Sequence, residues 1–416
     1  MRTSNRSAVR RIAAARLISL SGSEAAFTAL LFVLYRRTGS ATWVSAALLC
    51  TFGTMGALTP IGGWLGDHLD RRRVLIGSDL LGAVFFASLA LVHAPVALLL
   101  LAFLAAACEA VFSPTSTGAI PSLAGQESLA WANGTVATGA NIGFLIGPAL
   151  GGALVAVFGS STVFALNALS FVLSAAIVAS VRAPFAAHSP REGHRGLRAG
   201  FVFILHDPVL RTMAMAFVVF AVTIGSVLVA ELPLATSFHT GSVGYGLIAT
   251  CFGLGALLGS LAGRGLRPSA EHRTLVLASA VTAVGIGSVA FAPAFVLVLV
   301  GMLVSGTSDG LVDVAVLVIS QRRAPDEVRS RVAGAMETVF LLGIAISFLF
   351  AGSLVNAIGP KAAYLIAGAG CGIAALLLVP LLRIPSSAAP TSGRSEPVLE
   401  RPVPVDPRRT GPTSAE

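Results

Sequence analysis

Carboxylates inside long apolar runs are the residues of this sequence with the clearest capacity for chemistry. Glu24, Glu109, Asp309 and Asp313 lie in such runs, and the last two are four residues apart, on one face of a helix. An apolar environment favours the neutral form of a carboxyl group, so such a group can take up and release a proton or contact a cation. We predict these four residues as candidates for proton coupling or substrate contact. The structural alternative is a buried acid that pairs with a hydroxyl group or an arginine.

Three further acids, Asp79, Glu231 and Glu337, lie nearer the ends of apolar runs, where a purely structural role is the preferred interpretation. The sequence predicts no lysine or arginine at the middle of a run to pair with the acids, which favours neutral or cationic cargo over anions. Cysteines and histidines lack metal-ligand spacing, and no G-x-x-x-x-G-K-[ST] phosphate-binding loop is found. We therefore predict no catalytic residue, metal or cofactor, and a protein that is not an enzyme.

Composition excludes a soluble globular protein. The 416 residues are 55% hydrophobic and only 11% charged, whereas soluble domains carry about a quarter charged residues. The formal net charge of +9 does not indicate a nucleic-acid partner, because the basic residues are spread between apolar runs instead of gathering on one helix. The partner that this composition requires is the lipid bilayer.

The apolar runs predict an all-α polytopic membrane protein with twelve transmembrane helices in two pseudo-symmetric six-helix bundles, since one crossing needs about 20 apolar residues. The predicted spans are 16–35, 42–64, 74–92, 96–118, 132–156, 162–181, 210–232, 244–263, 274–291, 295–319, 332–356 and 361–382. With this topology, 25 of the 28 basic residues fall on one side. Positively charged loops stay in the cytoplasm, so we expect a multi-pass protein of the inner (plasma) membrane with both termini cytoplasmic.

The two halves look duplicated at an offset of 200 residues. Glycines recur in register, at 134, 143, 152 and 159 and again at 334, 343, 352 and 359. We therefore divide the chain into a basic cytosolic arm (1–15), a six-helix half (16–182), a cytosolic central loop (183–209), a second six-helix half (210–383) and a disordered cytosolic tail (384–416).

A short polar loop between the second and third spans contains a motif of glycine, acids and arginines. Its fixed positions are Gly63, Asp67, Asp70, Arg72 and Arg73. The spacing resembles the G-x-x-x-D-[RK]-x-G-x-[RK]-[RK] loop of major facilitator superfamily transporters, with His68 in place of the first basic residue and Asp70 in place of the second glycine. The resemblance implies that Asp67 holds a cytoplasmic gate closed against the facing half. The alternative for the arginines is that they only fix topology.

The fifth span contains a second motif, made of glycines and one proline: Gly134, Gly143, Gly147, Pro148, Gly151 and Gly152. It resembles the G-x8-G-x3-G-P-x2-G-G pattern of antiporter branches of the same superfamily, and every fixed position is met. Small residues let helix backbones approach closely, and proline can bend a helix. Generic glycine packing is the alternative interpretation.

Other segments, among them Phe112-Ser-Pro114 and Gln321-Arg-Arg-Ala-Pro325-Asp326-Glu327, are similar to the macrolide and multidrug exporter branch. The resemblance implies a secondary active transporter that exports amphipathic or cationic small molecules in exchange for protons by alternating access, and that works as a monomer. Lysophospholipid or siderophore transport by the same fold is the first alternative. A non-transporting membrane sensor or scaffold is the second.

Overall fold

The computed structural model describes residues 6–124, 128–181, 197–325 and 328–384, and in these ranges it contains helices and no strand. Twelve helices are long and apolar enough to cross a membrane, which confirms the predicted fold class. The first six are α1 (Arg6–Thr38), α2 (Ala41–His68), α3 (Arg71–Leu91), α4 (Pro95–Ala124), α5 (Leu129–Phe158) and α6 (Ser160–Ala179). The second six are α8 (Pro208–Ser237), α9 (Gly241–Ala262), α10 (Glu271–Val289), α11 (Phe295–Arg323), α12 (Arg329–Ile358) and α13 (Pro360–Leu378).

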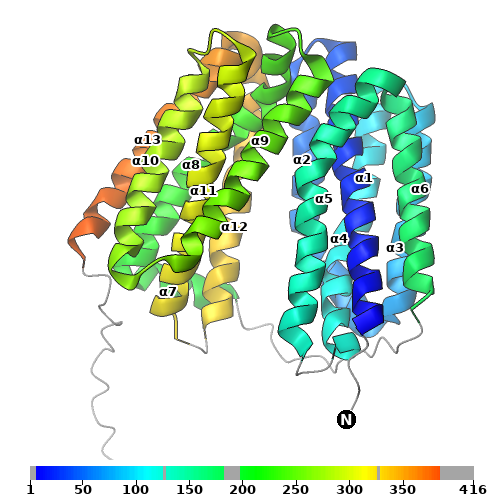
Figure 1. Ribbon diagram of the computed structural model, residues 1–416, viewed down its shortest axis with the longest axis horizontal. Coiled ribbons are helices and arrows are strands. Elements are labelled where there is room, and N and C mark those ends of the chain that lie inside the picture. The colour runs from blue at the N-terminus through cyan, green and yellow to red at the C-terminus, as the bar shows by residue number, and fades with distance from the viewer. Residues whose placement is uncertain (1–5, 125–127, 182–196, 326–327, 385–416) are drawn as a thin grey trace, which may run out of the picture.

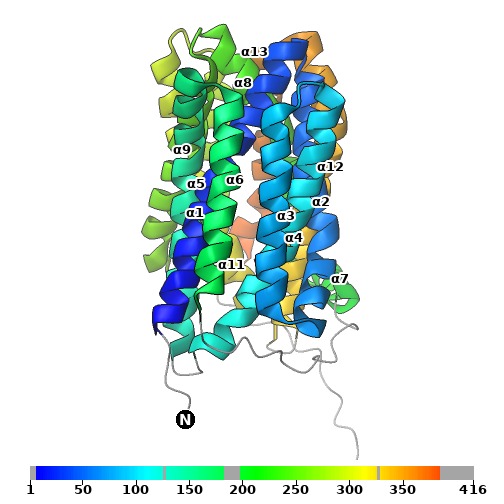
Figure 2. The same ribbon diagram turned by 90° about the vertical axis from the view of Figure 1, so that its right-hand side faces the viewer.

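Short helices occupy some of the connecting segments. The central loop contains α7 (Leu197–His206), and 3-10 turns are found at η2 (Gly263–Gly265), η3 (Pro268–Ala270) and η4 (Val379–Arg383). Figure 2 shows α7 at the end of the molecule where the N-terminus lies. Most of the predicted central loop, and the predicted disordered tail beyond Ile384, lie outside the described residues.

The helix boundaries follow from local chemistry. Asp70 and Asp207 cap α3 and α8, because each side chain accepts hydrogen bonds from two backbone N–H groups of the first turn. Gly159 and Gly359 take φ values of 79° and 83° between paired helices, a conformation that favours glycine. Helix α1 begins at Arg6, so residues 6–15 of the predicted arm are helical.

The two six-helix halves approach each other at one end and diverge at the other. Figure 1 shows the bundles close together at the end opposite the N-terminus and spread apart at the N-terminal end. One apolar core includes residues of both halves, such as Leu31 and Leu232. Two further cores belong to one half each, around Ile12 and around Met213. A cavity between the halves is therefore closed at the end away from the N-terminus.

The helix pairs that close this end correspond to each other at the 200-residue offset, because α5 corresponds to α12 and α2 to α9. Helix α5 packs against α9, and α2 packs against α12. Ser242 Oγ donates to the carbonyl of Gly152 at 3.0 Å, and Ser45 Oγ donates to the carbonyl of Phe348 at 2.5 Å. Every span of the first half has a counterpart about 200 residues later, so the predicted duplication extends over all twelve spans.

Candidate functional site

A cavity of about 370 Å³ lies between the two halves, lined by residues of α1, α2, α3, α4, α5, α8 and α9. Three carboxylates face it: Glu24 of α1, Glu109 of α4 and Glu231 of α8. Its lining residues include no lysine, arginine or histidine. The central cavity, as we call it, therefore presents three acidic groups and no basic side chain in its own wall.

The rest of the wall is apolar and aromatic. Phe27 and Phe52 meet edge to face, with ring centroids 6.3 Å apart, and Tyr245 lines the α9 side. The hydroxyl of Ser23 also faces the cavity and has no hydrogen-bond partner among the described residues. Aromatic faces attract cations, and a few polar groups in an apolar pocket orient a ligand. This surface suits a molecule with an apolar body and a positive charge.

Two of the four predicted acids, Glu24 and Glu109, thus lie in one site, and Glu231 joins them although the sequence analysis favoured a structural role for it. The predicted span ended at residue 232, which placed Glu231 at the membrane surface. Helix α8 continues to Ser237, so Glu231 lies inside the protein with 4% of its surface exposed. The missed signal was the apolar sequence beyond Glu231, which extends the helix.

Arg16 also differs from its predicted place at the cytosolic edge. Because α1 begins at Arg6, Arg16 lies within the six-helix half, where it donates a 2.9 Å hydrogen bond to Ser113 Oγ. Its guanidinium lies 5.6 Å from the ring centroid of Phe112 and within charge-interaction range of Glu109 and Asp79. Arg16 lies toward the N-terminal end of α1 and not at the middle of a run, and its charge interaction with Glu109 agrees with the structural alternative for that acid, although Arg16 does not line the central cavity.

The other predicted pair, Asp309 and Asp313, lies elsewhere. Both residues line a separate cavity of about 170 Å³ inside the second half, and this cavity shares no lining residue with the central cavity. Glu337 is exposed on α12. The seven acidic residues considered from the sequence are thus divided between the two cavities, the buried surroundings of Arg16 (Asp79) and the protein surface (Glu337).

The helix-5 motif forms the contacts of α5 with both halves. A Cβ atom at Gly151 would lie 2.6 Å from the backbone of Ala25 in α1, and one at Gly147 would clash with the side chain of Glu24. On another face, a Cβ atom at Gly152 would clash with the carbonyl of Ser242 in α9. Pro148 lines the central cavity. Gly143 packs on α1, whereas Gly134 has open space around it.

Where α2 passes into α3, the buried arginine is Arg71, which the predicted motif positions did not include. Arg71 is only 3% exposed and donates to the carbonyls of Gly66 (2.9 Å) and Gly118 (2.7 Å), which ties α2 and α4 to the start of α3. Asp70 caps α3. Arg72 donates to the carbonyl of Ala179.

The remaining loop residues are more peripheral. The side chain of Arg73 is 89% exposed and lies 4.0 Å from the carboxylate of Asp70. A Cβ atom at Gly63 would be 4.0 Å from Pro114 of α4. The side chain of Asp67 lies outside the described part of the structure, so its gate role stays a prediction.

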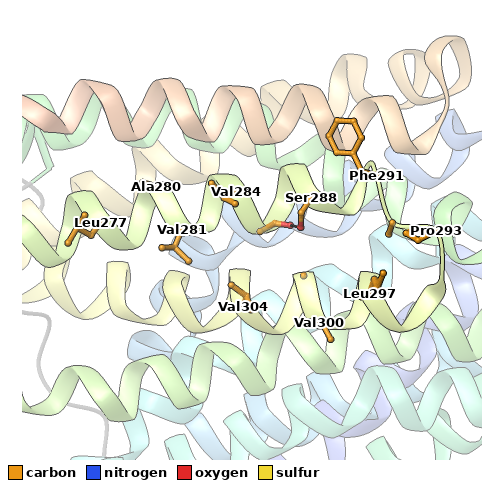
Figure 3. A pocket seen from close by; sticks show the side chains of 13 residues that line it. Leu277, Ala280, Val281, Val284, Ser288, Phe291, Pro293, Leu297, Val300 and Val304 are labelled. Carbon is orange, nitrogen blue, oxygen red and sulfur yellow. Dashed lines mark hydrogen bonds between the residues drawn. The ribbon is translucent and has the colours of Figure 1, made fainter.

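A larger groove, of about 540 Å³, lies between α10 and α11 and has a different character. Figure 3 shows aliphatic side chains such as Leu277, Val281, Val300 and Val304 along it. None of its lining residues is ionisable. It therefore lacks the convergent polar groups that orient a small molecule in a specific site.

Comparison with known proteins assigns the family. The family model for the Major Facilitator Superfamily matches residues 12–347 and 226–411. The chain belongs to this superfamily. Among superfamily members, multidrug efflux pump Tap of Mycobacterium tuberculosis (strain ATCC 25618 / H37Rv) is 28% identical over 383 residues, covering 88% of this chain and 91% of Tap. Enterobactin exporter EntS of Citrobacter koseri is 26% identical over 351 residues, covering 82% and 84%.

Solved structures of superfamily transporters share the fold. The nucleoside transporter NupG superposes with a TM-score of 0.74 at 14% identity, covering 90% of this chain and 99% of NupG. A bacterial homologue of the human lysosomal transporter Spinster, in an inward-facing and unoccupied conformation, gives 0.68 at 15% identity, covering 92% and 96%. This protein is thus a multi-pass membrane transporter with the superfamily fold.

Proposed function

We propose that this transporter exports amphipathic or cationic small molecules in exchange for protons. The observation that carries the proposal is the central cavity, in which Glu24, Glu109 and Glu231 face aromatic and aliphatic side chains without a basic lining residue. A cation and a proton compete for the same carboxylates. Protonation of the carboxylates from the outside would then release the cargo there. Loss of the protons to the cytoplasm would let the next cargo molecule bind.

The orientation follows from charge. Arginines dominate the side of the membrane that holds the N-terminus and the loop between α2 and α3, whereas Arg36, Arg37 and Lys361 lie at the opposite ends of their helices. The positive-inside rule supports a cytoplasmic location for both termini and an inner (plasma) membrane protein. In this orientation the shared apolar core closes the cavity toward the outside, so the structure corresponds to a state that loads cargo from the cytoplasm.

Proton entry can drive such export. One proton moving inward gains about 2.3 kcal/mol per 100 mV of membrane potential. Since about 1.4 kcal/mol corresponds to a ten-fold concentration ratio, this sustains roughly a fifty-fold gradient of a neutral cargo. A monovalent cation exchanged for one proton moves no net charge, so the pH difference across the membrane drives its export. We further propose that the monomer is the working unit, because the cavity is formed within one chain.

Transport of a siderophore is the second candidate, and the similarity to an enterobactin exporter supports it. Siderophores of the catecholate type and lysophospholipids present acidic groups, however, and carboxylates without a basic neighbour in the cavity wall would repel them. The cavity chemistry therefore favours the cationic cargo over both anionic alternatives.

The test uses the purified full-length protein in proteoliposomes that contain a pH-sensitive dye. Tetraphenylphosphonium, a catecholate siderophore and a lysophospholipid are added separately under an imposed proton gradient. The proposal predicts proton movement stimulated by the lipophilic cation. Proton-independent flipping of the lysophospholipid would favour a lipid transporter instead, and movement of the siderophore alone would favour a siderophore transporter. Inactivity toward a broad cation panel would favour a sensor or scaffold.

A further inference from the structure

The two halves can be compared residue by residue because residue n of the first half occupies the place of residue n+200 in the second. Helices α4 and α11 begin at residues 95 and 295, α5 and α12 span 129–158 and 329–358, and their closing glycines have φ values of 79° and 83°. A difference in side-chain chemistry at paired positions is therefore a difference between two copies of one place in the fold.

In the first half, one such place holds a positive charge. The guanidinium of Arg16 donates to Ser113 Oγ at 2.9 Å, lies 5.6 Å from the ring centroid of Phe112 and interacts with the charges of Glu109 and Asp79. The arginine side chain belongs to α1, and the groups around it come from α3 and α4. These helices together form a site for a guanidinium that the chain itself supplies.

In the second half, the same five positions line the 170 Å³ cavity, but the arginine is missing. Residue 16 corresponds to Ala216, a small residue that is 2% exposed, and positions 79 and 112 correspond to Ser279 and Val312. Glu109 corresponds to Asp309, and Ser113, which accepts the hydrogen bond of the guanidinium, corresponds to Asp313. The cavity thus lies where the first half places its guanidinium, and it has gained a carboxylate at the position that binds it.

The surroundings of this cavity also suit a cation. Phe217, Phe220 and Phe340 line it, with Phe340 6.3 Å by ring centroids from each of the other two. Neither Asp309 nor Asp313 forms a hydrogen bond or ion pair with any other residue in the described ranges. When both aspartates are ionised, their like charges repel each other, because the residues lie one helical turn apart. A bound cation removes this repulsion, and aromatic faces add to its attraction.

From this correspondence we infer that the cavity between α8, α10, α11, α12 and α13 binds a small organic cation of the guanidinium or alkylammonium class, with Asp309 and Asp313 as its ligands. The cation takes the place of the Arg16 side chain. The cavity volume of about 170 Å³ is several times the roughly 30 Å³ that one water occupies in the liquid, which leaves room for an ion of a few heavy atoms. The site is separate from the central cavity and does not rest on proton coupling or on export.

The test measures the thermal unfolding midpoint of the purified full-length protein in detergent. Guanidinium chloride is titrated in the low millimolar range at constant ionic strength, and urea serves as the neutral probe of the same shape. Denaturation by either compound needs molar concentrations, so a rise of the midpoint with guanidinium reports binding. We expect guanidinium, but not urea, to raise the midpoint of the wild-type protein.

Variants assign the site. Asp309→Asn and Asp313→Asn should each weaken the binding of guanidinium about ten-fold or more, because a charged hydrogen bond is lost. Glu24→Gln and Glu231→Gln, in the central cavity, should leave it unchanged. Ala216→Arg should abolish the guanidinium effect, since its own side chain fills the cavity. In the otherwise wild-type protein, Ala216→Arg should also raise the unfolding midpoint. In the Asp309→Asn/Asp313→Asn double variant, the same substitution should lower the midpoint.

Three results would overturn the inference. They are equal effects of guanidinium and urea, a guanidinium effect that survives both aspartate substitutions, and one that is lost on changing Glu24 or Glu231. If an asparagine variant does not fold, Ala216→Arg in the wild-type background decides. A guanidinium response that persists in this variant contradicts a site at residue 216.

Discussion

Ser242 of α9 donates a 3.0 Å hydrogen bond to the carbonyl oxygen of Gly152 in α5, and this bond crosses between the two halves. At the 200-residue offset, Gly152 corresponds to Gly352 of α12 and Ser242 corresponds to Thr42 of α2. These two residues also meet closely, since a Cβ atom at Gly352 would lie 2.5 Å from the Cα of Thr42. The closed end of the cavity is thus built twice by the same close approach of helix backbones. Both contacts depend on a glycine.

Substitution of Gly152 should weaken the closed end. A Cβ atom there would clash with the carbonyl of Ser242, and backbone cannot move aside cheaply. We expect Gly152→Ala to lengthen the distance between spin labels at Ser161 and Thr236, as measured by double electron–electron resonance. Gly134→Ala is the matched control, because this motif glycine on the same helix has open space around it. Equal distance distributions in both variants would contradict the assigned contact.

Asn356 provides a polar contact between the halves at the same end. Its side chain donates to Ser40 Oγ (2.9 Å) and Thr42 Oγ1 (3.0 Å) and accepts from the backbone N–H of Ala41 (2.8 Å). Net contributions of about 0.5–1.5 kcal/mol per hydrogen bond imply that Asn356→Ala shifts the closed population several-fold. The same spin-label pair measures this shift. An unchanged population would mean that water replaces these bonds fully.

Arg71 and Arg73 lie in the first turn of α3 but have different environments. Arg71→Gln should lower the free energy of unfolding by about 1.5–3 kcal/mol, because charged hydrogen bonds to buried carbonyls are lost. Arg73→Gln should change it by less than about 0.5 kcal/mol, since its side chain is 89% exposed. Thermal unfolding in detergent compares the two. Equal destabilisation would falsify the structural role of Arg71.

The sequence predicted the span number and the duplication because both depend on apolar length and spacing, which the bilayer imposes directly. It also located Glu24 and Glu109, since an acid in an apolar run stands out. It did not predict where helices end beyond the apolar core. Arg16 and Glu231 were therefore placed near the membrane surface, although α1 and α8 extend past the predicted limits.

Side-chain direction was the other unpredictable quantity. Three consecutive arginines look equivalent in sequence, and only the crossing of α2, α3 and α4 buries Arg71 while Arg73 points to solvent. Likewise, the position of Asp309 and Asp313 outside the central cavity depends on the rotation of α11. Helix periodicity shows that the two share a face, but not which neighbours that face meets.

The central claim is that the carboxylates of the central cavity couple cargo to protons, and cargo-stimulated proton movement in proteoliposomes tests it most directly. Glu24→Gln, Glu109→Gln and Glu231→Gln keep the shape of each side chain and remove its charge. Glu337→Gln, on an exposed residue outside the cavity, is the control. We predict that Glu337→Gln retains proton movement stimulated by tetraphenylphosphonium and that the triple cavity variant, folded and inserted, loses it. Coupled proton movement at the wild-type rate in the triple variant would contradict the claim.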